Sequence, residues 1–310
     1  MPKSLSAIYF KLVLTALFWG ATWIAGRVAV QEASPFAIAS WRFLLAAAIL
    51  GALLVSREGW PKWSGRDWLL LAALGLSGVF FYNIFFLYGL RRVEAGRGAL
   101  VTASIPALIA LVDWLCFRLP MSAKRASGVA LALFGCLLVV TRGHPTQLLN
   151  GDIGGGELLL VGAAFSWVSY TLISRYCARR FSALAMTFGA CFTGWLMLTV
   201  AGLGDGSLFA FGAMSWRGWT SIGFLALFGT VIAFTWYCEA ISRVGTTKTA
   251  SFINLVPLFA VLLGALMLGE RLDAPVLAGG AIVIAGVLLT SRAAQKNSAL
   301  ATPNALQPGD

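Results

Sequence analysis

Aromatic side chains recur inside long runs without charged residues, at spacings that place them on one face of a helix. Trp19 and Trp23 are four residues apart, Trp167 is three residues from Tyr170, and Tyr82 lies in another such run. Residues three or four apart on a helix are neighbours on its surface. An indole ring offers a flat apolar surface and one N–H donor. These side chains are therefore suited either to holding a ligand or to packing between helices.

Two prolines and two asparagines fall in runs of the same kind: Pro106, Pro257, Asn83 and Asn254. A proline inside a helix lacks an N–H and displaces the carbonyl four residues back, which for Pro106 belongs to Thr102. We predict helix breaks at both prolines, either lining a ligand path or serving packing alone. The buried amides need partners. They either bind polar groups of a ligand or bridge two helices.

Groups that could perform catalysis or hold a metal are few. The sole histidine, His144, directly precedes a proline, and the five cysteines show no CxxC spacing. No P-loop motif that would bind ATP is present. The sequence therefore predicts no catalytic residue, no metal site, no cofactor and no enzyme.

Arg42, Asp113 and Glu239 are charged residues that interrupt apolar stretches of the sequence. Arg42 lies about six residues inside its run; a charge at such depth is a functional candidate by default, although its long side chain could instead reach the nearer interface. Asp113 and Glu239 are predicted near the ends of their runs. The sequence thus offers no carboxylate at the centre of a run that could carry a proton.

Composition places these runs in a membrane. Hydrophobic residues make up 59% of the 310 residues and charged residues only 11%, whereas soluble proteins carry about a quarter charged residues. A helix needs about 20 apolar residues to cross the hydrocarbon layer. We predict an all-α integral membrane protein with ten transmembrane helices, over residues 8–30, 36–55, 68–90, 97–118, 125–142, 155–176, 183–203, 219–241, 246–268 and 275–292.

The net charge of +11 is spread singly between the apolar runs rather than along one face. This distribution argues against nucleic-acid binding, which needs a continuous basic surface. An excess of Lys and Arg on the side of the N-terminus predicts that both termini are cytoplasmic. Residues 293–310 are predicted to form a disordered cytoplasmic tail.

Two halves of the sequence repeat each other. A shift of 148 residues maps Trp19 and Arg27 onto Trp167 and Arg175. A shift of 151 residues maps a further series, Trp68, Gly78, Arg92, Val93, Pro106, Gly128 and Gly135, onto Trp219, Gly229, Arg243, Val244, Pro257, Gly279 and Gly286. We predict two five-helix repeats, 1–145 and 146–292. Because five is odd, the second repeat has inverted topology, an architecture that transporters use for alternating access.

Glycines seven residues apart mark the last predicted helix of each half. They are Gly128 with Gly135, and Gly279 with Gly286. Small residues at this spacing allow another helix backbone to approach closely. We interpret these faces as packing surfaces or as contacts of a homodimer.

The motifs resemble those of a known family. The relevant stretches are Trp19-Gly20 with Trp23, Trp41-Arg42-Phe43, Pro257-Leu258-Phe259 and Leu268-Gly269-Glu270-Arg271-Leu272. They are similar to EamA-type repeats of the drug/metabolite transporter superfamily. The first half departs from the pattern, with Leu115-Cys116-Phe117-Arg118-Leu119 where the second half has the Gly-Glu pair. We therefore interpret that pair as structural.

The resemblance implies export of amino acids or related metabolites, and the aromatic-rich centre is similar to the aromatic and neutral amino-acid exporters. We expect an inner-membrane exporter of aromatic and other apolar amino acids that works by alternating access, through facilitated movement or exchange. The alternatives are a multidrug or other metabolite exporter of the same fold, and a non-transporting membrane receptor or scaffold. The predicted substrate-binding residues are Trp19, Trp23, Tyr82, Asn83, Thr102, Trp167, Tyr170 and Asn254.

Overall fold

The computed structural model describes residues 5–144, 154–204, 206–209, 214–245, 249 and 252–300, and in this part of the chain it is all-helical. The first repeat contains α1 (Leu5–Glu32), α2 (Pro35–Glu58), a third span of α3 (Gly65–Leu74), η1 (Gly75–Phe81) and α4 (Tyr82–Leu90), a fourth of α5 (Ala95–Thr102) and α6 (Ile105–Phe117), and α7 (Ala123–Val140). The second contains α9 (Gly155–Cys177), α10 (Ala183–Gly204), a span of α11 (Trp216–Ala226), η2 (Leu227–Ile232) and α12 (Ala233–Val244), α14 (Val256–Leu268) and α15 (Ala274–Leu300).

Nine of the described helices, counting composite ones, are long and apolar enough to cross a membrane, and α14 is a shorter apolar helix. The predicted ninth span, 246–268, begins with residues that lie mostly outside the described part. The boundary between the predicted repeats, at residues 145 and 146, lies outside it too. The last helix runs to Leu300, eight residues beyond the predicted end at 292. Residues 301–310 of the predicted tail are outside the description.

Local sequence signals explain where these helices begin. Ser34 precedes Pro35, the first residue of α2, and its hydroxyl accepts a hydrogen bond from the Ala37 amide at 3.1 Å. Proline is favoured there because the first helical N–H needs no partner within the helix. Ser64 and Asp67 form a reciprocal capping box at the start of α3, which satisfies two free amides.

The predicted helix breaks are present at the same register of both repeats. In the first repeat α5 ends at Thr102, and α6 begins at Ile105 with Pro106 in its first turn. In the second, a turn at residues 254–255 precedes α14, whose first turn contains Pro257. The interruption falls just before each proline, because a helix can begin but not continue through this residue.

Two π-helical segments, η1 and η2, also occupy equivalent positions in the repeats. In η1 the Tyr82 amide bonds to the Ser77 carbonyl, and in η2 the Ala233 amide bonds to the Phe228 carbonyl, each five residues back. Short π-helical segments inside α-helices often occur at functional sites. Their repetition is a structural sign of duplication that the sequence analysis did not predict.

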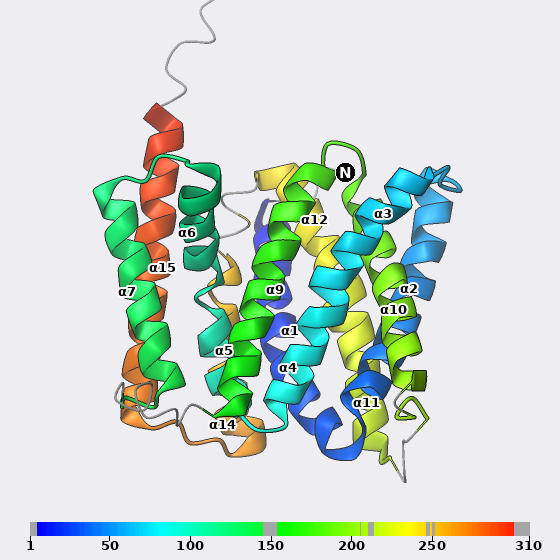
Figure 1. Cartoon of the computed structure of the whole chain (residues 1–310), viewed down its shortest axis with the longest axis horizontal. Coiled ribbons are helices and arrows are strands. Elements are labelled where there is room, and N and C mark those ends of the chain that lie inside the picture. The colour runs from blue at the N-terminus through cyan, green and yellow to red at the C-terminus, as the bar shows by residue number, and fades with distance from the viewer. Residues whose placement is uncertain are drawn as a thin grey trace, which may run out of the picture. The chain divides into compact units, whose positions relative to one another are not determined.

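The helices form two compact units. The large unit comprises α1 to α5 and α9 to α14, and the small unit comprises α6, α7 and α15. In the large unit α2 packs on α10 and α4 on α9, so helices of different repeats are neighbours (Figure 1).

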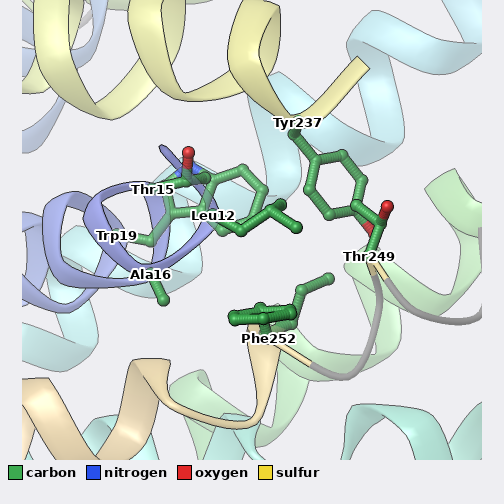
Figure 2. A pocket seen from close by; sticks show the side chains of 8 residues that line it. Leu12, Thr15, Ala16, Trp19, Tyr237, Thr249 and Phe252 are labelled. Atoms are coloured by element: carbon green, nitrogen blue, oxygen red, sulfur yellow. The ribbon is translucent and has the colours of Figure 1, made fainter. Parts of the chain in front are cut away.

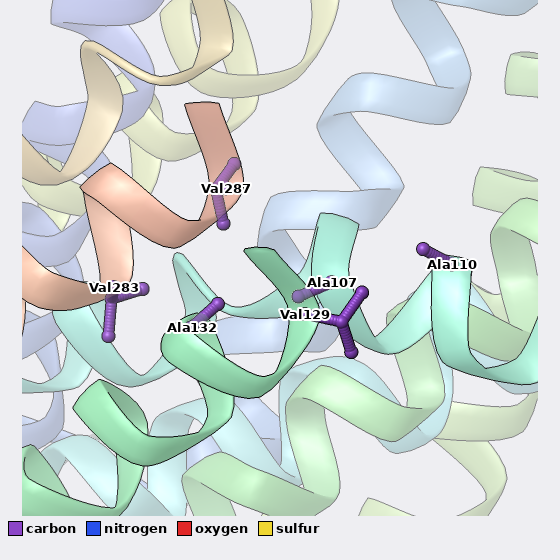
Figure 3. Packing of buried hydrophobic residues seen from close by; sticks show 6 residues of the cluster. All are labelled: Ala107, Ala110, Val129, Ala132, Val283 and Val287. Atoms are coloured by element: carbon purple, nitrogen blue, oxygen red, sulfur yellow. The ribbon is translucent and has the colours of Figure 1, made fainter. Parts of the chain in front are cut away.

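The small unit is built on the predicted glycine faces. A Cβ atom on Gly128 would lie 2.9 Å from the Gly286 carbonyl oxygen, and one on Gly135 would lie 2.7 Å from the Gly279 carbonyl oxygen. Helices α7 and α15 are therefore antiparallel, and their backbones are nearly in contact. Buried small side chains fill the rest of the interface, as Figure 3 shows: Ala107, Ala110, Val129, Ala132, Val283 and Val287. The packing interpretation of these glycines is thus the one realised within the chain.

Candidate substrate site

Four of the predicted aromatic residues lie in one continuous row of ring contacts within the large unit. Trp23 of α1 contacts Phe86 edge-on at a centroid distance of 4.8 Å, and Phe86 stacks on Tyr82 at 5.7 Å. Tyr82 contacts Trp167 of α9 at 5.0 Å, and Trp167 contacts Tyr170 at 5.2 Å. The row joins helices of both repeats. In this conformation the rings pack against one another between the helices, and their role in holding a ligand stays a prediction.

Glycines admit two of these rings to their positions. A Cβ atom on Gly78 of η1 would lie 2.3 Å from the Tyr170 ring, and one on Gly98 of α5 would lie 2.7 Å from the Trp23 ring. Any larger residue would collide with the ring. These glycines therefore fix how closely the backbone approaches the aromatic row.

Trp19 lies in a second aromatic group, against the other repeat. Its indole N–H donates to the Gly229 carbonyl of η2 at 3.1 Å. Its ring contacts Phe234 at 5.6 Å and Tyr237 at 5.3 Å. The π-helical segment thus supplies a backbone acceptor to a tryptophan of the opposite repeat.

A narrow hollow runs beside Trp19, shown in Figure 2. It holds about 150 Å³ of empty volume but leaves no space for a water-sized sphere. Thr15, which lines it, is buried, and its hydroxyl has no hydrogen-bond partner. Ligand pockets usually measure about 300–1,000 Å³. The hollow is therefore closed in this conformation and must widen to admit a metabolite. Its walls come from α1, α12 and the segment before α14: Leu12, Thr15, Ala16, Trp19, Tyr237, Thr249, Phe252 and Ile253.

Arg42 is buried, with 8% of its surface exposed. Its two terminal nitrogens donate to the Asn83 side-chain oxygen at 3.0 Å and to the Thr230 hydroxyl at 3.2 Å. The alternative in which Arg42 reaches the membrane interface is therefore wrong. The sequence fixes the depth of this residue along α2 but not the face on which its side chain lies.

Asn83 thus serves as a bridge between helices in this conformation. Its amide nitrogen donates to the Val79 carbonyl at 2.7 Å, which leaves its oxygen to accept from Arg42. Through Tyr82, its neighbour in sequence, the Arg42 group is continuous with the aromatic row. Five of the eight predicted residues therefore lie in this network, and Trp19 lies in the second aromatic group.

Thr102 and Asn254 are the other two predicted residues, and both lie at the helix breaks. Thr102 ends α5, and its hydroxyl donates to the Ala99 carbonyl at 3.1 Å. Asn254 lies in the turn before α14, next to Ile253 of the hollow. Neither makes a hydrogen bond or ring contact with the network among the contacts described. Pro257 is buried in the large unit, and Pro106 lies in α6 of the small unit.

Carboxylates at the helices are paired with basic side chains. Glu239 lies 2.6 Å from Lys11, and Asp113 lies 3.8 Å from Arg125. Asp67 binds Arg180. A fourth pair, Arg97 with Glu157 at 2.8 Å, is almost fully buried. No sequence pattern singled out this pair, which only the packing of α5 on α9 brings together.

The Gly-Glu pair after α14 has a structural role. Gly269 takes the left-handed conformation with φ of 66° and ends the helix. The Glu270 carboxylate then accepts hydrogen bonds from the amides of Ala95 and Gly96 at 2.7 and 2.9 Å. A negative charge is favourable at these free amides of a helix N-terminus. The prediction that this pair is structural agrees with this geometry.

In the described residues no cluster of three His, Cys, Asp or Glu side chains could hold a metal ion. The model of the EamA-like transporter family matches residues 6–141 and 154–292, which are the two halves of the chain. This chain belongs to the EamA-like transporter family. It is a membrane transporter with two EamA repeats, as the sequence motifs indicated.

Relatives of this EamA transporter are similar over nearly its whole length. The uncharacterized transporter YyaM of Bacillus subtilis is 30% identical, covering 92% of this chain and 93% of the relative. The uncharacterized inner membrane transporter YedA of Escherichia coli K12 is 29% identical, over 93% and 92% of the two chains. A crystal structure with 18% identity covers 94% of this chain and 100% of its own, with a TM-score of 0.62. That likeness concerns the fold alone.

Proposed function

We propose that this EamA transporter exports aromatic and other apolar amino acids. The observation that carries the proposal is the row of Trp23, Tyr82, Trp167 and Tyr170, which adjoins the buried Arg42 and Asn83. An apolar side chain favours the rings, and the α-amino and carboxylate groups favour the polar residues. Such a division of a site, mainly apolar with a few placed polar groups, is typical of small-molecule pockets.

The charges of the network argue for this class over phosphorylated metabolites. Phosphate recognition uses several positive groups, often in bidentate pairs. Arg42 is the one cation that hydrogen-bonds to the network in the part of the chain described. A single guanidinium matches one carboxylate rather than a diphosphate.

The two ends of the large unit support alternating access. At one end Glu270 caps α5 and Arg97 pairs with Glu157, so this end is closed. The hollow extends from Trp19 toward the other end, where Lys11 pairs with Glu239. If the contacts of Glu270 and Arg97 broke and the Lys11 end closed, the Arg42 group and the aromatic row would become accessible from the other side of the membrane.

We further propose facilitated movement or exchange without a coupled proton. Asp113 and Glu239, the two carboxylates that the sequence places in spans, are each held in an ion pair with a basic side chain, which supports a structural role for both. The test imposes a pH gradient on liposomes with equal substrate on both sides. We expect no net uphill accumulation. Accumulation that is lost in Asp113→Asn or Glu239→Gln would show proton coupling.

The location that we propose is a cytoplasmic membrane with both termini cytoplasmic. The excess of Lys and Arg on the N-terminal side supports it. A homodimer remains compatible with this proposal, but the glycine faces of α7 and α15 are occupied within the chain. A second copy would therefore have to bind elsewhere.

The proposed substrate class is tested by counterflow into liposomes containing the purified protein. We expect exchange of phenylalanine, tryptophan and methionine, and a reduced rate in Trp167→Ala at normal membrane expression. Trp216→Ala is a matched control because Trp216 is 71% exposed. Movement of nucleotide sugars but not of phenylalanine would contradict the proposed class, and flux of no solute would favour the receptor alternative.

A further inference from the structure

The Arg42 group joins the two repeats at the place where their helices depart from α geometry. Arg42 comes from α2, Asn83 lies in the first turn of α4 directly after η1, and Thr230 lies within η2. Three segments of two repeats thus converge on one guanidinium. Movement of one repeat against the other must alter these hydrogen bonds.

The Arg42 charge has no ion pair among the described residues, and both of its hydrogen-bond partners are neutral. Its Nε atom is buried without a hydrogen-bond partner. A buried charge is costly when neutral groups alone compensate it, whereas a carboxylate forms stronger, bidentate bonds with a guanidinium. By contrast, the other buried arginine, Arg97, has the carboxylate of Glu157.

The two neutral partners are held with their oxygens toward the guanidinium. The Thr230 hydroxyl donates to the Leu225 carbonyl at 3.0 Å, so it accepts from Arg42. The Asn83 amide nitrogen donates to Val79, so the side-chain oxygen faces Arg42. One oxygen therefore lies at each terminal nitrogen of Arg42. This is the arrangement that the two oxygens of one carboxylate would take.

We propose that Arg42 binds the carboxylate of the transported solute, and that Asn83 and Thr230 occupy the place of that carboxylate when the solute is absent. This inference deepens the proposed function and rests on it for the nature of the solute. It assigns the acid group to Arg42 and the apolar group to the adjacent Tyr82 and Trp167. When the solute carboxylate replaces these two neutral acceptors, it offsets more of the cost of burying the Arg42 charge. Asn83 and Thr230 are then released from Arg42, which links solute binding to movement at the π-helical segments.

The test compares acids with the corresponding carboxamides, which lack the carboxylate charge, as ligands of the full-length protein in detergent. The probes are L-phenylalanine with L-phenylalaninamide, and 3-phenylpropionate with 3-phenylpropanamide. Thermal stabilisation and quenching of tryptophan fluorescence report binding. We expect each acid to bind at least about tenfold more tightly than its amide, which corresponds to the advantage of a charged hydrogen-bonded pair.

Three variants test the role of Arg42. Arg42→Gln should remove the preference for acids, and Arg42→Lys should keep part of it because the charge remains without the bidentate fork. Arg57→Gln is the matched control, since Arg57 is an exposed residue of the same helix. Equal preference for acids in Arg42→Gln and the wild type would overturn the inference.

Thr230→Val keeps Arg42 and removes one competing oxygen. Here we expect tighter binding of 3-phenylpropionate than in the wild type, the opposite sign from Arg42→Gln. This variant keeps the proposal testable if Arg42→Gln does not fold. Weaker binding in Thr230→Val would overturn the exchange of acceptors.

The outcomes separate this inference from the proposed function. Arg42-dependent binding of 3-phenylpropionate without transport of phenylalanine would support the carboxylate site and contradict the amino-acid substrate. Transport of phenylalanine that is unchanged in Arg42→Gln would support the substrate class and contradict the site.

Discussion

The two ends of the large unit are held together by contacts of different kinds. At the end where α1 finishes, ionic groups are buried or bind backbone: Arg97 pairs with Glu157, Glu270 caps α5, and Arg27 donates to the Leu90 carbonyl. We call this the capped end. At the Lys11 end, the pair of Lys11 and Glu239 is partly exposed, with 22% and 25% of the side-chain surfaces accessible, and the buried Asp67 binds Arg180, whose side chain is 53% exposed.

This difference indicates which state the structure represents. Buried charged contacts are specific and intolerant of change, whereas exposed pairs contribute little and are easily replaced by water. In the alternating-access cycle that we propose, the capped end would be the closed gate, and the Lys11 end would need the least rearrangement to admit a solute. If the N-terminus is cytoplasmic, the state is one that is closed to the outside.

The largest effect is expected from breaking the buried pair at the capped end. Glu157→Gln leaves Arg97 buried without its carboxylate, and such single changes typically cost about 3–5 kcal/mol. Thermal unfolding in detergent should show a strongly lowered midpoint. Replacing both residues together, Arg97→Met with Glu157→Leu, should recover most of the loss. Arg92→Gln, at an exposed arginine of the same region, should have little effect. A harmless Glu157→Gln would remove the distinction between the ends.

The next largest effect is expected at Glu270. Glu270→Ala removes the acceptor for the amides of Ala95 and Gly96, and a hydrogen bond to a charged group contributes about 1.5–3 kcal/mol. The free energy of unfolding should fall by a similar amount. It should fall less in Glu270→Gln, because the amide side chain keeps one acceptor oxygen. Glu94→Gln, just before α5, is the control. If Glu270→Ala and Glu94→Gln melted alike, the carboxylate would not be what holds α5.

A smaller effect is expected at the other end. Lys11→Met or Glu239→Gln should change the free energy of unfolding by no more than about 1 kcal/mol, as is usual for partly exposed ion pairs. High salt should mask even this change, because it screens exposed charges far more than buried ones. A salt series of melting curves for Lys11→Met and Glu157→Gln measures both effects. Equal salt sensitivity of the two pairs would contradict the comparison.

The smallest effect is expected at Thr15 in the hollow. Its hydroxyl is buried without a partner, so Thr15→Val should be neutral or stabilising by up to about 1 kcal/mol. Thr193 is the matched residue, since its hydroxyl lies 2.8 Å from the Gly189 carbonyl and 3.0 Å from that of Leu71. Thr193→Val should therefore destabilise the protein. A clear loss of stability in Thr15→Val would mean that its hydroxyl has a partner after all.

Features that are set by local sequence, such as the spans and the helix breaks, were predictable. The spans follow from the apolar runs, and the breaks at Pro106 and Pro257 follow from the chemistry of proline. The repeat follows from the register of equivalent residues. The members of the aromatic row could be named from the sequence. Trp23, Tyr82, Trp167 and Tyr170 lie in apolar stretches that contain few polar side chains.

Features that depend on which helix faces meet were not predictable. The depth of Arg42 could be counted along its span, but its bond to Thr230, 188 residues away, could not. Arg97 begins the predicted span 97–118, and nothing in that position indicates that it pairs with Glu157 of α9. The π-helical segments shift the helical register within spans whose apolar pattern is continuous. No periodicity could therefore reveal them.

The contact between α7 and α15 also bears on how the two repeats arose. Gly128 lies against Gly286, the repeat equivalent of Gly135, while Gly135 lies against Gly279, the equivalent of Gly128. Each surface therefore meets its own copy in reverse, which is the defining property of an isologous, twofold interface. A single ancestral five-helix chain inserting in both orientations could have formed this contact with a second copy of itself. Fusion of two such genes would turn a contact between subunits into one within a single chain, and would free the two copies to diverge.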